Sequence, residues 1–317
     1  MDPDTFLAQD DVHLLVQAMN TFALEVDAAD ARKDTLVNAG IHHAFRSKLT
    51  FETSSHLFAN KLVARFREYR VSQQRPAYHP MVSLLDYLLK GHELEDQDRN
   101  LFKKLVKQGL ENFAGLTALS AVGRIEAPPG TAMGTGVLVG RQLLLTCKHV
   151  VERISDNGLD RAWARFGYKT GRYGVETGEV FELDLKTITN YNSQSGDAFD
   201  YILVEIVGKP EYRVAPLSSD FLNTKQQVRL IHHPRGEPAQ ISEVGHIVQV
   251  DKDYIKHNVR TDYGSSGAPI FDLSWRVVAI HRGTLSLSRP SAPGVTEGVP
   301  LYCIWDDIKP CLSTLVA

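Results

Sequence analysis

The chain has 317 residues, of which 43% are hydrophobic and 23% are charged, and its formal net charge at pH 7 is -3. These values are typical of a soluble globular protein and exclude a chain dominated by disorder, and the length predicts two domains. Because basic residues are not in excess, we expect neither nucleic acid nor an anionic membrane as a partner.

The N-terminal stretch MDPDTFLAQDD is acidic and lacks the basic start and apolar block of a secretory signal. No apolar run approaches the ~20 residues that a membrane-spanning helix needs. The cysteines Cys147, Cys303 and Cys311 have no metal-ligand spacing, which predicts neither a disulfide framework nor a zinc site. We therefore expect a cytoplasmic protein with reduced thiols and with no cofactor.

Residues 1–114 are predicted to form a helical domain, because their apolar residues recur at helical spacing. The stretch HPMVSLLDYLLKG carries Pro80 in its first turn and ends at Gly91, as helices commonly do. The stretch DQDRNLFKKLVKQG has acidic residues at its start and lysines later, and we expect it to stop at Gly109. The pattern predicts a bundle of four or five antiparallel helices.

Residues 115–317 show a different sequence pattern, in which short apolar runs are separated by glycines and polar clusters. The runs are VGRIEA, GTGVLVG, QLLLT, VFELDL, YILVEI, VRLIHH, GHIVQV, APIFDL and VVAIHR. Runs of this length and spacing predict an antiparallel barrel or sandwich. A short helix from about Ile304, limited or kinked by Pro310, is expected near the C-terminus.

The stretch TDYGSSGAPIFD, residues 261–272, places two serines between glycines just before an apolar run. A serine becomes nucleophilic when an imidazole accepts its proton and a carboxylate orients that imidazole. His149 follows two strand-like runs, and Asp200 directly precedes the apolar run 201–204, whereas Asp197 is expected in a loop. A purely structural His149 and a strand-capping or solvated Asp200 are the alternative interpretations.

Three segments, GTGVLVGRQLLLTCKHVV, DYILV and GSSGAPIF, occur in this order and resemble the chymotrypsin-fold serine peptidases. The closest resemblance is to the disulfide-free bacterial trypsin-like and glutamyl-endopeptidase-like branch, which LIHHPRGEPAQIS also resembles. It covers residues 118–315 and implies a chymotrypsin-like antiparallel double β-barrel. The expected fold class is therefore α+β multidomain, with helical residues 1–114 followed by a protease domain at 115–317.

The resemblance implies a role for each matching residue. His149 would be the general base, Asp200 its orienting acid and Ser266 the nucleophile. The backbone N–H groups of Gly264 and Ser266 would form the oxyanion hole. Many secreted relatives carry an aspartate at the position of Ser265 that pairs with a newly cut N-terminus. Because that acid is absent here, we expect control to come from elsewhere, and the helical domain is the available candidate.

The same resemblance assigns substrate-binding roles to Thr261 and His281, which in the glutamyl-endopeptidase branch contact an acidic substrate side chain. A hydroxyl and an imidazole can satisfy a buried carboxylate, and Arg282 could add charge. The alternative for His281 is a structural histidine bonded to the backbone. His232 is expected to be packed and His233 to lie in a turn, and without a third ligand at suitable spacing we expect no metal site.

The helical half contains no motif that carries chemistry. Its size and helicity resemble the effector-associated or death-fold-like adaptor domains that precede proteases in bacterial conflict systems, which implies a protein partner. An inhibitory prodomain or a dimerisation unit are the alternatives. The function expected for the whole chain is an intracellular serine endopeptidase acting on protein or peptide substrates, with a possible preference for acidic P1 residues. A catalytically silent binding or scaffold module, and an esterase, are the competing hypotheses.

Overall fold

The computed structural model describes residues 7–25, 28–69, 78–171, 174–186, 199–283 and 294–314. Its contacts divide the chain into two compact units, Met1–Leu116 and Thr117–Ala317. Within the described ranges, no helix combines the length and the apolar character needed to cross a bilayer.

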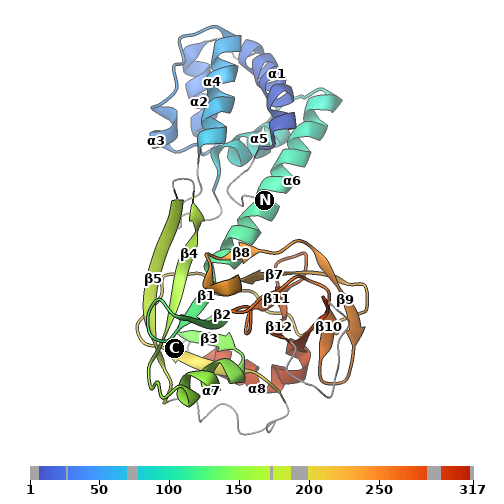
Figure 1. Ribbon diagram of the computed structural model, residues 1–317. Coiled ribbons are helices and arrows are strands. Elements are labelled where there is room, and N and C mark those ends of the chain that lie inside the picture. The colour runs from blue at the N-terminus through green and yellow to red at the C-terminus, as the bar shows by residue number, and fades with distance from the viewer. Residues whose placement is uncertain are drawn as a thin grey trace. The chain divides into compact units, whose positions relative to one another are not determined.

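The first unit is helical (Figure 1). Its helices are α1 (Gln9–Glu25), α2 (Ala29–Asn38), α3 (His43–Arg46), α4 (Ser55–Glu68), α5 (Pro80–Gly91) and α6 (Asp96–Ser120), the last of which runs past the boundary between the units. Leu15, Phe58, Leu62, Leu84 and Phe102 are at most 1% exposed and belong to one apolar core. The apolar residues that recur at helical spacing therefore face the interior of this unit.

Two details of the helical prediction were wrong. The described part of the helical unit holds six helices instead of four or five, because the short α3 separates α2 from α4. The last helix also continues through Gly109 to Ser120. Gly109 packs against α5, where an added Cβ would lie 2.3 Å from Cγ2 of Val82. This glycine permits close helix packing and does not end the helix.

One buried cation organises the helical unit. Arg32 on α2 is 1% exposed, and its guanidinium donates to the carbonyl oxygens of Ala23, Phe51 and Thr53 at 2.8–3.1 Å. It also donates to Oγ of Ser55 at 3.0 Å. Buried charges are tolerated when hydrogen bonds replace their hydration, so Arg32 ties α1, α2 and the approach to α4 together.

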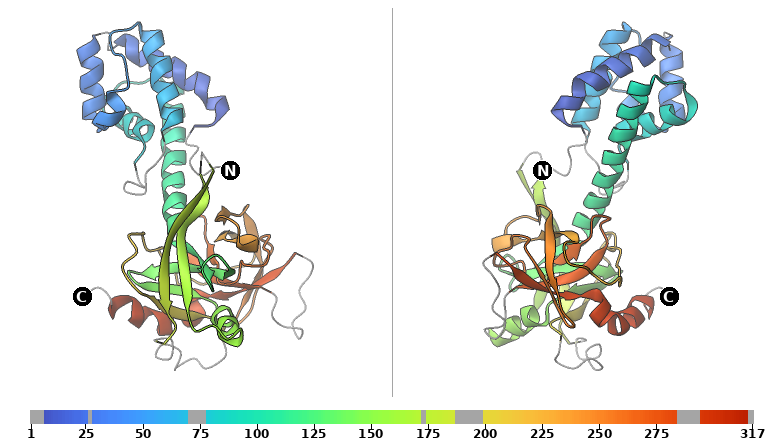
Figure 2. Two further views of the ribbon diagram at one scale, coloured as in Figure 1. Left: turned by 60° about the vertical axis from the view of Figure 1, so that its left-hand side comes forward. Right: turned by 90° about the vertical axis from the view of Figure 1, so that its right-hand side faces the viewer.

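The first sheet of the second unit is a closed barrel with the order β1-β2-β3-β6-β5-β4. Its strands are β1 (Val122–Glu126), β2 (Ala132–Gly140), β3 (Leu143–Thr146), β4 (Ala162–Gly171), β5 (Gly174–Asp184) and β6 (Ile202–Ile206). Figure 2 shows the long β4–β5 hairpin extending beyond the barrel. Short α7 (Lys148–Asp156) follows β3 directly.

The second sheet has the order β11-β12-β13-β10-β9-β7-β8, and a further pairing of β11 with β7 closes six of these strands into a ring. Its strands are β7 (Gln227–His232), β8 (Gln240–Ile241), β9 (Gly245–Val250), β10 (Ile255–His257), β11 (Pro269–Phe271), β12 (Val277–Gly283) and β13 (Thr296–Pro300). Helix α8 (Leu301–Thr314) packs on β12 and β13 (Figure 2).

The expected fold class is confirmed: a helical region precedes a chymotrypsin-like pair of antiparallel sheets. The nine predicted runs all fall on strands, but β4, β8, β10, β13 and α7 were not predicted. β8 and β10 are two and three residues long, too short to show a period. The C-terminal helix begins at Leu301, earlier than Ile304, and contains Pro310.

We expect Arg32→Met to lower the free energy of unfolding of the full chain by about 2–4 kcal/mol, because the hydrogen bonds of the guanidinium to the carbonyls of Ala23, Phe51 and Thr53 are lost. The matched control is Arg65→Met, since Arg65 makes an exposed ion pair with Glu68 and should change stability by about 0.5 kcal/mol or less. Urea unfolding followed by circular dichroism measures both. Equal effects of the two substitutions would contradict the role given to Arg32.

Candidate active site

Strand register brings His149 and Asp200 together. β3 and β6 are antiparallel neighbours, and Thr146 at the end of β3 lies opposite Ile202 at the start of β6. His149 follows Thr146 by three residues, and Asp200 precedes Ile202 by two. Segments 51 residues apart therefore meet at one edge of the first barrel.

Two hydrogen bonds join the pair. Nδ1 of His149 lies 2.6 Å from Oδ2 of Asp200, and the backbone N–H of His149 donates to Oδ1 at 3.0 Å. An ionised carboxylate only accepts, so the ring proton sits on Nδ1 and the lone pair on Nε2. Nε2 is buried and accepts no hydrogen bond from any described residue. The arrangement leaves that nitrogen available to take a proton.

The carboxylate of Asp200 stays ionised despite its surroundings. Burial by itself raises the pKa of Asp200, but hydrogen bonds from His149 and the charges of His149 and Arg282 outweigh burial, and the pKa is lowered. Its side chain is 13% exposed. Asp200 can therefore stabilise an imidazolium at neutral pH without taking the proton itself.

Ser266 lies in the turn before β11, held by the first barrel. The backbone N–H of Thr135 on β2 donates to the carbonyl of Ser266 at 2.8 Å. An added Cβ on neighbouring Gly134 would lie 3.0 Å from that carbonyl and 2.9 Å from the methyl groups of Val150. Since Val150 follows His149 in α7, the serine turn lies beside the first turn of α7.

Gly267 makes this approach possible. Its φ of +84° is rare for other residues, and an added Cβ would lie 2.1 Å from Oγ1 of Thr146 and 2.2 Å from the carbonyl of Thr135. The N–H of Gly267 donates to the carbonyl of His281 at 2.8 Å, and Sγ of Cys147 donates to the same oxygen at 3.3 Å. One carbonyl thus links the residue after the serine with the segment before His149.

The backbone of the serine turn presents two amides. Gly264 has a φ of +87°, and an added Cβ would lie 2.6 Å from the carbonyl of His233. The carbonyl of Tyr263 accepts a hydrogen bond from the N–H of Arg235 at 2.5 Å. Because the peptide bond between Tyr263 and Gly264 is planar and trans, the N–H of Gly264 points the opposite way. In the described part of the chain neither this amide nor that of Ser266 has an acceptor.

The two adjacent serines have different surroundings. Ser265 is fully buried, and its Oγ lies 2.8 Å from Nδ1 of His232 and accepts from the N–H of Asp262 at 3.2 Å. Ser266 is partly exposed, and its hydroxyl bonds no described residue. Ser265 supports the turn, and Ser266 is the serine that a substrate could reach.

Thr261 and His281 are not joined by a hydrogen bond in the structure. Thr261 is half-buried, whereas His281 is 2% exposed and its Nδ1 lies 3.1 Å from Nε2 of His257. Burial is the main cause that holds the pKa of His281 well below its usual value and lowers that of His257 to about 4. The sequence offered no sign of His257, because it lies on the three-residue β10.

Arg282 forms a buried ion pair that was also not predicted. Its Nε lies 3.5 Å from Oε2 of Glu297, whose side chain is fully buried. Gly283 and Glu297 are register partners on β12 and β13, and only this pairing brings the two charges together. Because Arg282 also lowers the pKa of Asp200, its cation is near the candidate catalytic carboxylate as well.

Cys147, His149 and Asp200 place three ligand-type atoms within 4.8 Å of one another. Burial raises the pKa of Cys147 well above its usual value, so the thiol keeps its proton, and a thiol must lose it to bind a metal. Nδ1 of His149 is already committed to Asp200. Cys147 and His149 thus already make hydrogen bonds within the protein, and the three side chains do not fit a metal centre. Cys303 and Cys311 are free thiols like Cys147.

Residues 134–280 match the model of the trypsin-like peptidase domain, and residues 9–108 match that of effector-associated domain 8. The glutamyl endopeptidase of Staphylococcus aureus strain MRSA252 is 23% identical over 186 residues, which are 56% of this chain and 50% of that protein. The uncharacterized protein y4fB of Sinorhizobium fredii is 30% identical over 189 residues, 53% of this chain and 28% of that protein. The chain thus spans half or less of the length of these two curated relatives.

Solved structures similar to this chain include an HtrA-type protease, AlgW, with a tripeptide, at 18% identity and a TM-score of 0.47. That match covers 63% of this chain and 62% of the other. A serine endoprotease from Yersinia pestis matches at 15% identity with a TM-score of 0.48, over 64% of this chain and 66% of its own.

We expect Asp200→Asn to lower the free energy of unfolding at pH 7 by about 1.5–3 kcal/mol, because charge-assisted hydrogen bonds to His149 are lost. The folded pKa of Asp200 lies below its ordinary value of 3.8, so the unfolded chain binds the proton first and this stability is lost as pH falls below about 4. Urea midpoints across pH should show the gap between wild type and variant narrowing in acid. Asp160→Asn, at an exposed position, should show no such gap.

Proposed function

Since the chain carries a trypsin-like peptidase domain behind an effector-associated domain 8, we propose that it is a serine endopeptidase with His149, Asp200 and Ser266 as its triad. The observation that supports this most is the hydrogen-bonded His149–Asp200 pair beside the turn that exposes Ser266. The pair comes from the first barrel and the serine from the second sheet, so one cleft between two sheets would hold all three.

The chemistry follows from the protonation states. Nε2 of His149 accepts the Ser266 proton as Oγ attacks the substrate carbonyl, and Asp200 stabilises the imidazolium that forms. The amides of Gly264 and Ser266 would donate to the oxyanion, a contribution of roughly 10²–10³ in rate per donor. The imidazolium then protonates the leaving amine, and water activated by the same ring hydrolyses the acyl-enzyme.

We assign residues 1–114 to partner recognition and residues 115–317 to catalysis. Effector-associated domains are named for their link to effectors, which supports a protease that a partner recruits in a bacterial defence pathway. The three free thiols are in keeping with a reducing, intracellular compartment.

A catalytically silent scaffold is the second candidate. It is favoured by one observation: Nε2 of His149 has no partner among the described residues, so the serine–histidine hydrogen bond is not formed. Catalytic hydrogen bonds often close only when substrate binds, which keeps the peptidase proposal ahead.

For the substrate we propose a preference for acidic P1 residues, with Thr261 and His281 as the residues that contact the substrate side chain. The similarity to glutamyl endopeptidase supports it. The cation of Arg282, next to His281, is already paired with Glu297 and adds no free charge. His281 would act as a neutral hydrogen-bonding group, because burial holds its pKa well below the usual value.

Labelling by a fluorophosphonate probe tests the triad. Ser266→Ala should abolish labelling, and Ser265→Ala should retain it, because only Ser266 is reachable. Asp200→Asn should slow labelling by about 10³–10⁴-fold through loss of the correct imidazole tautomer. Labelling that survives Ser266→Ala would refute the assignment, and a wild-type chain that never labels would favour the scaffold.

A peptide-library cleavage profile tests the P1 proposal. Glutamate and aspartate should be enriched at P1, and Thr261→Val should reduce kcat/KM for a P1 glutamate peptide, relative to its glutamine analogue, by about tenfold through loss of one hydrogen bond to a charged group. Thr177→Val, at an exposed position on β5, is the control. A profile without acidic residues would remove the roles of Thr261 and His281.

A further inference from the structure

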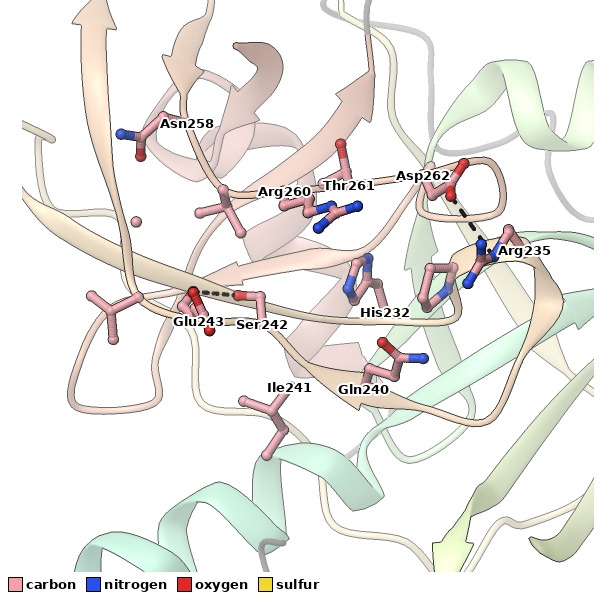
Figure 3. Close-up of a pocket in the computed structure, with 14 residues that line it drawn as sticks. His232, Arg235, Gln240, Ile241, Ser242, Glu243, Asn258, Arg260, Thr261 and Asp262 are labelled. Atoms are coloured by element: carbon pink, nitrogen blue, oxygen red, sulfur yellow. Dashed lines mark hydrogen bonds and ion pairs between the residues drawn. The ribbon is translucent and has the colours of Figure 1, made fainter. Parts of the chain in front are cut away.

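A cavity of about 550 Å³ lies between residues 240–245 and residues 258–262 (Figure 3). Its lining includes Asp262, which is two residues before Gly264 in the serine turn. We call this turn the oxyanion turn, because the amides of Gly264 and Ser266 are the proposed oxyanion donors. This volume is in the range of ligand sites. His149, Asp200, Ser266 and His281 are not among its lining residues. Thr261 is, so the cavity adjoins the proposed substrate site and shares that one residue with it.

The cavity is lined by an arginine that no carboxylate of the described residues neutralises. Arg260 is exposed and has neither a hydrogen bond nor an ion pair with any described residue. Arg235 also lines the cavity but is paired: its Nη2 lies 3.3 Å from Oε1 of Glu237, and its Nε lies 3.8 Å from Oδ2 of Asp262. An arginine fork without an acceptor is suited to a carboxylate or another planar anion.

The backbone beside Arg260 is unpaired as well. In the described part of the chain, the N–H and C=O groups of Val259, Arg260 and Thr261 form no hydrogen bond. Backbone groups without partners can pair with an added peptide, as an open strand edge does. The cavity therefore offers both a backbone partner and a side-chain cation to an incoming segment.

The charge of the lining favours a single carboxylate over a phosphate. Burial lowers the pKa of His232 to about 4, so its ring is neutral at pH 7 and adds no positive charge. The carboxylates of Glu243 and Asp262 are also in the lining (Figure 3) and would repel a dianion.

The cavity is connected to the oxyanion turn through two of its lining residues. Nδ1 of His232 lies 2.8 Å from Oγ of Ser265, and the N–H of Asp262 donates to the same oxygen at 3.2 Å. Ser265 lies between Gly264 and Ser266, whose amides are the proposed oxyanion donors. A ligand that moves His232 or Asp262 acts directly on that turn.

We propose that this cavity is a second peptide site, in which Arg260 binds a carboxylate of an acidic peptide segment and the backbone of residues 259–260 binds that of the peptide, and that occupancy is transmitted to the oxyanion turn through His232, Asp262 and Ser265. The second half of this inference rests on the proposed peptidase function. Peptide binding in the cavity would then control the turn. In many secreted relatives, that control comes from an aspartate at the position of Ser265 that pairs with a newly cut N-terminus.

Binding is tested without catalysis, on full-length Ser266→Ala protein. The probe is fluorescein-labelled Gly-Val-Glu-Val amide, compared by fluorescence anisotropy with its glutamine analogue. We expect Arg260→Gln to weaken binding of the glutamate peptide by about 10- to 100-fold, with little effect on binding of the analogue. Arg260→Lys should weaken binding of the glutamate peptide less, because it keeps the charge. Arg213→Gln, an exposed arginine outside the cavity, should leave the affinity unchanged. Equal affinities of the two peptides, or an affinity independent of Arg260, overturns the site.

The coupling is tested by the rate of fluorophosphonate labelling of the wild-type chain. Saturating glutamate peptide should raise that rate, and Arg260→Gln should abolish the response. An unchanged rate at saturation overturns the coupling. Absence of labelling under all conditions contradicts the peptidase proposal instead, because the anisotropy measurement then still decides whether the peptide site exists.

Discussion

Hydrogen bonds of a single residue, Thr135, hold the candidate active site together. From β2 in the first barrel its N–H donates to the carbonyl of Ser266, and its Oγ1 donates to the carbonyl of Gly264 at 2.8 Å. The same Oγ1 accepts from the N–H of His233 at 3.2 Å, and the Thr135 carbonyl accepts from Thr146 at 2.7 Å. Because Thr135 is fully buried, water does not compete for these bonds, and they fix the serine turn against the barrel that carries His149.

This constraint explains why the free polar groups of the site gather in one place. The carbonyls of Gly264 and Ser266 accept hydrogen bonds from Thr135, and that of Tyr263 accepts from Arg235. The amides of Ser265 and Gly267 donate to Asp262 and His281, whereas those of Gly264 and Ser266 have no acceptor among the described residues. Nε2 of His149 is likewise unpartnered in the described part of the chain. Buried groups without partners are costly and rare in folded proteins. Two amides and an imidazole nitrogen without partners at one site are what a reaction that develops negative charge and moves a proton requires.

The pairing of His232 with Ser265 gives the turn a neutral support. A buried imidazole with a pKa of about 4 carries no charge at pH 7, and a hydroxyl satisfies it without introducing one. An aspartate at this position would need a nearby cation for its own burial. A turn supported by neutral groups takes no counter-charge from Arg260, which has no partner among the described residues and lines the adjoining cavity.

The sequence by itself determined the division into a helical and a β region, most strands, and the candidate residues His149, Asp200 and Ser266, because period and turn chemistry are local properties of the chain. It could not decide where α6 ends, since Gly109 stops a helix in one context and permits close packing against Val82 in another. The support of the turn by Thr135, the pairing of His257 with His281 and of Arg282 with Glu297, and the cavity around Arg260 were decided only by the tertiary structure. Each joins residues far apart in the chain through strand register and sheet closure, and no local pattern encodes which strand lies beside which.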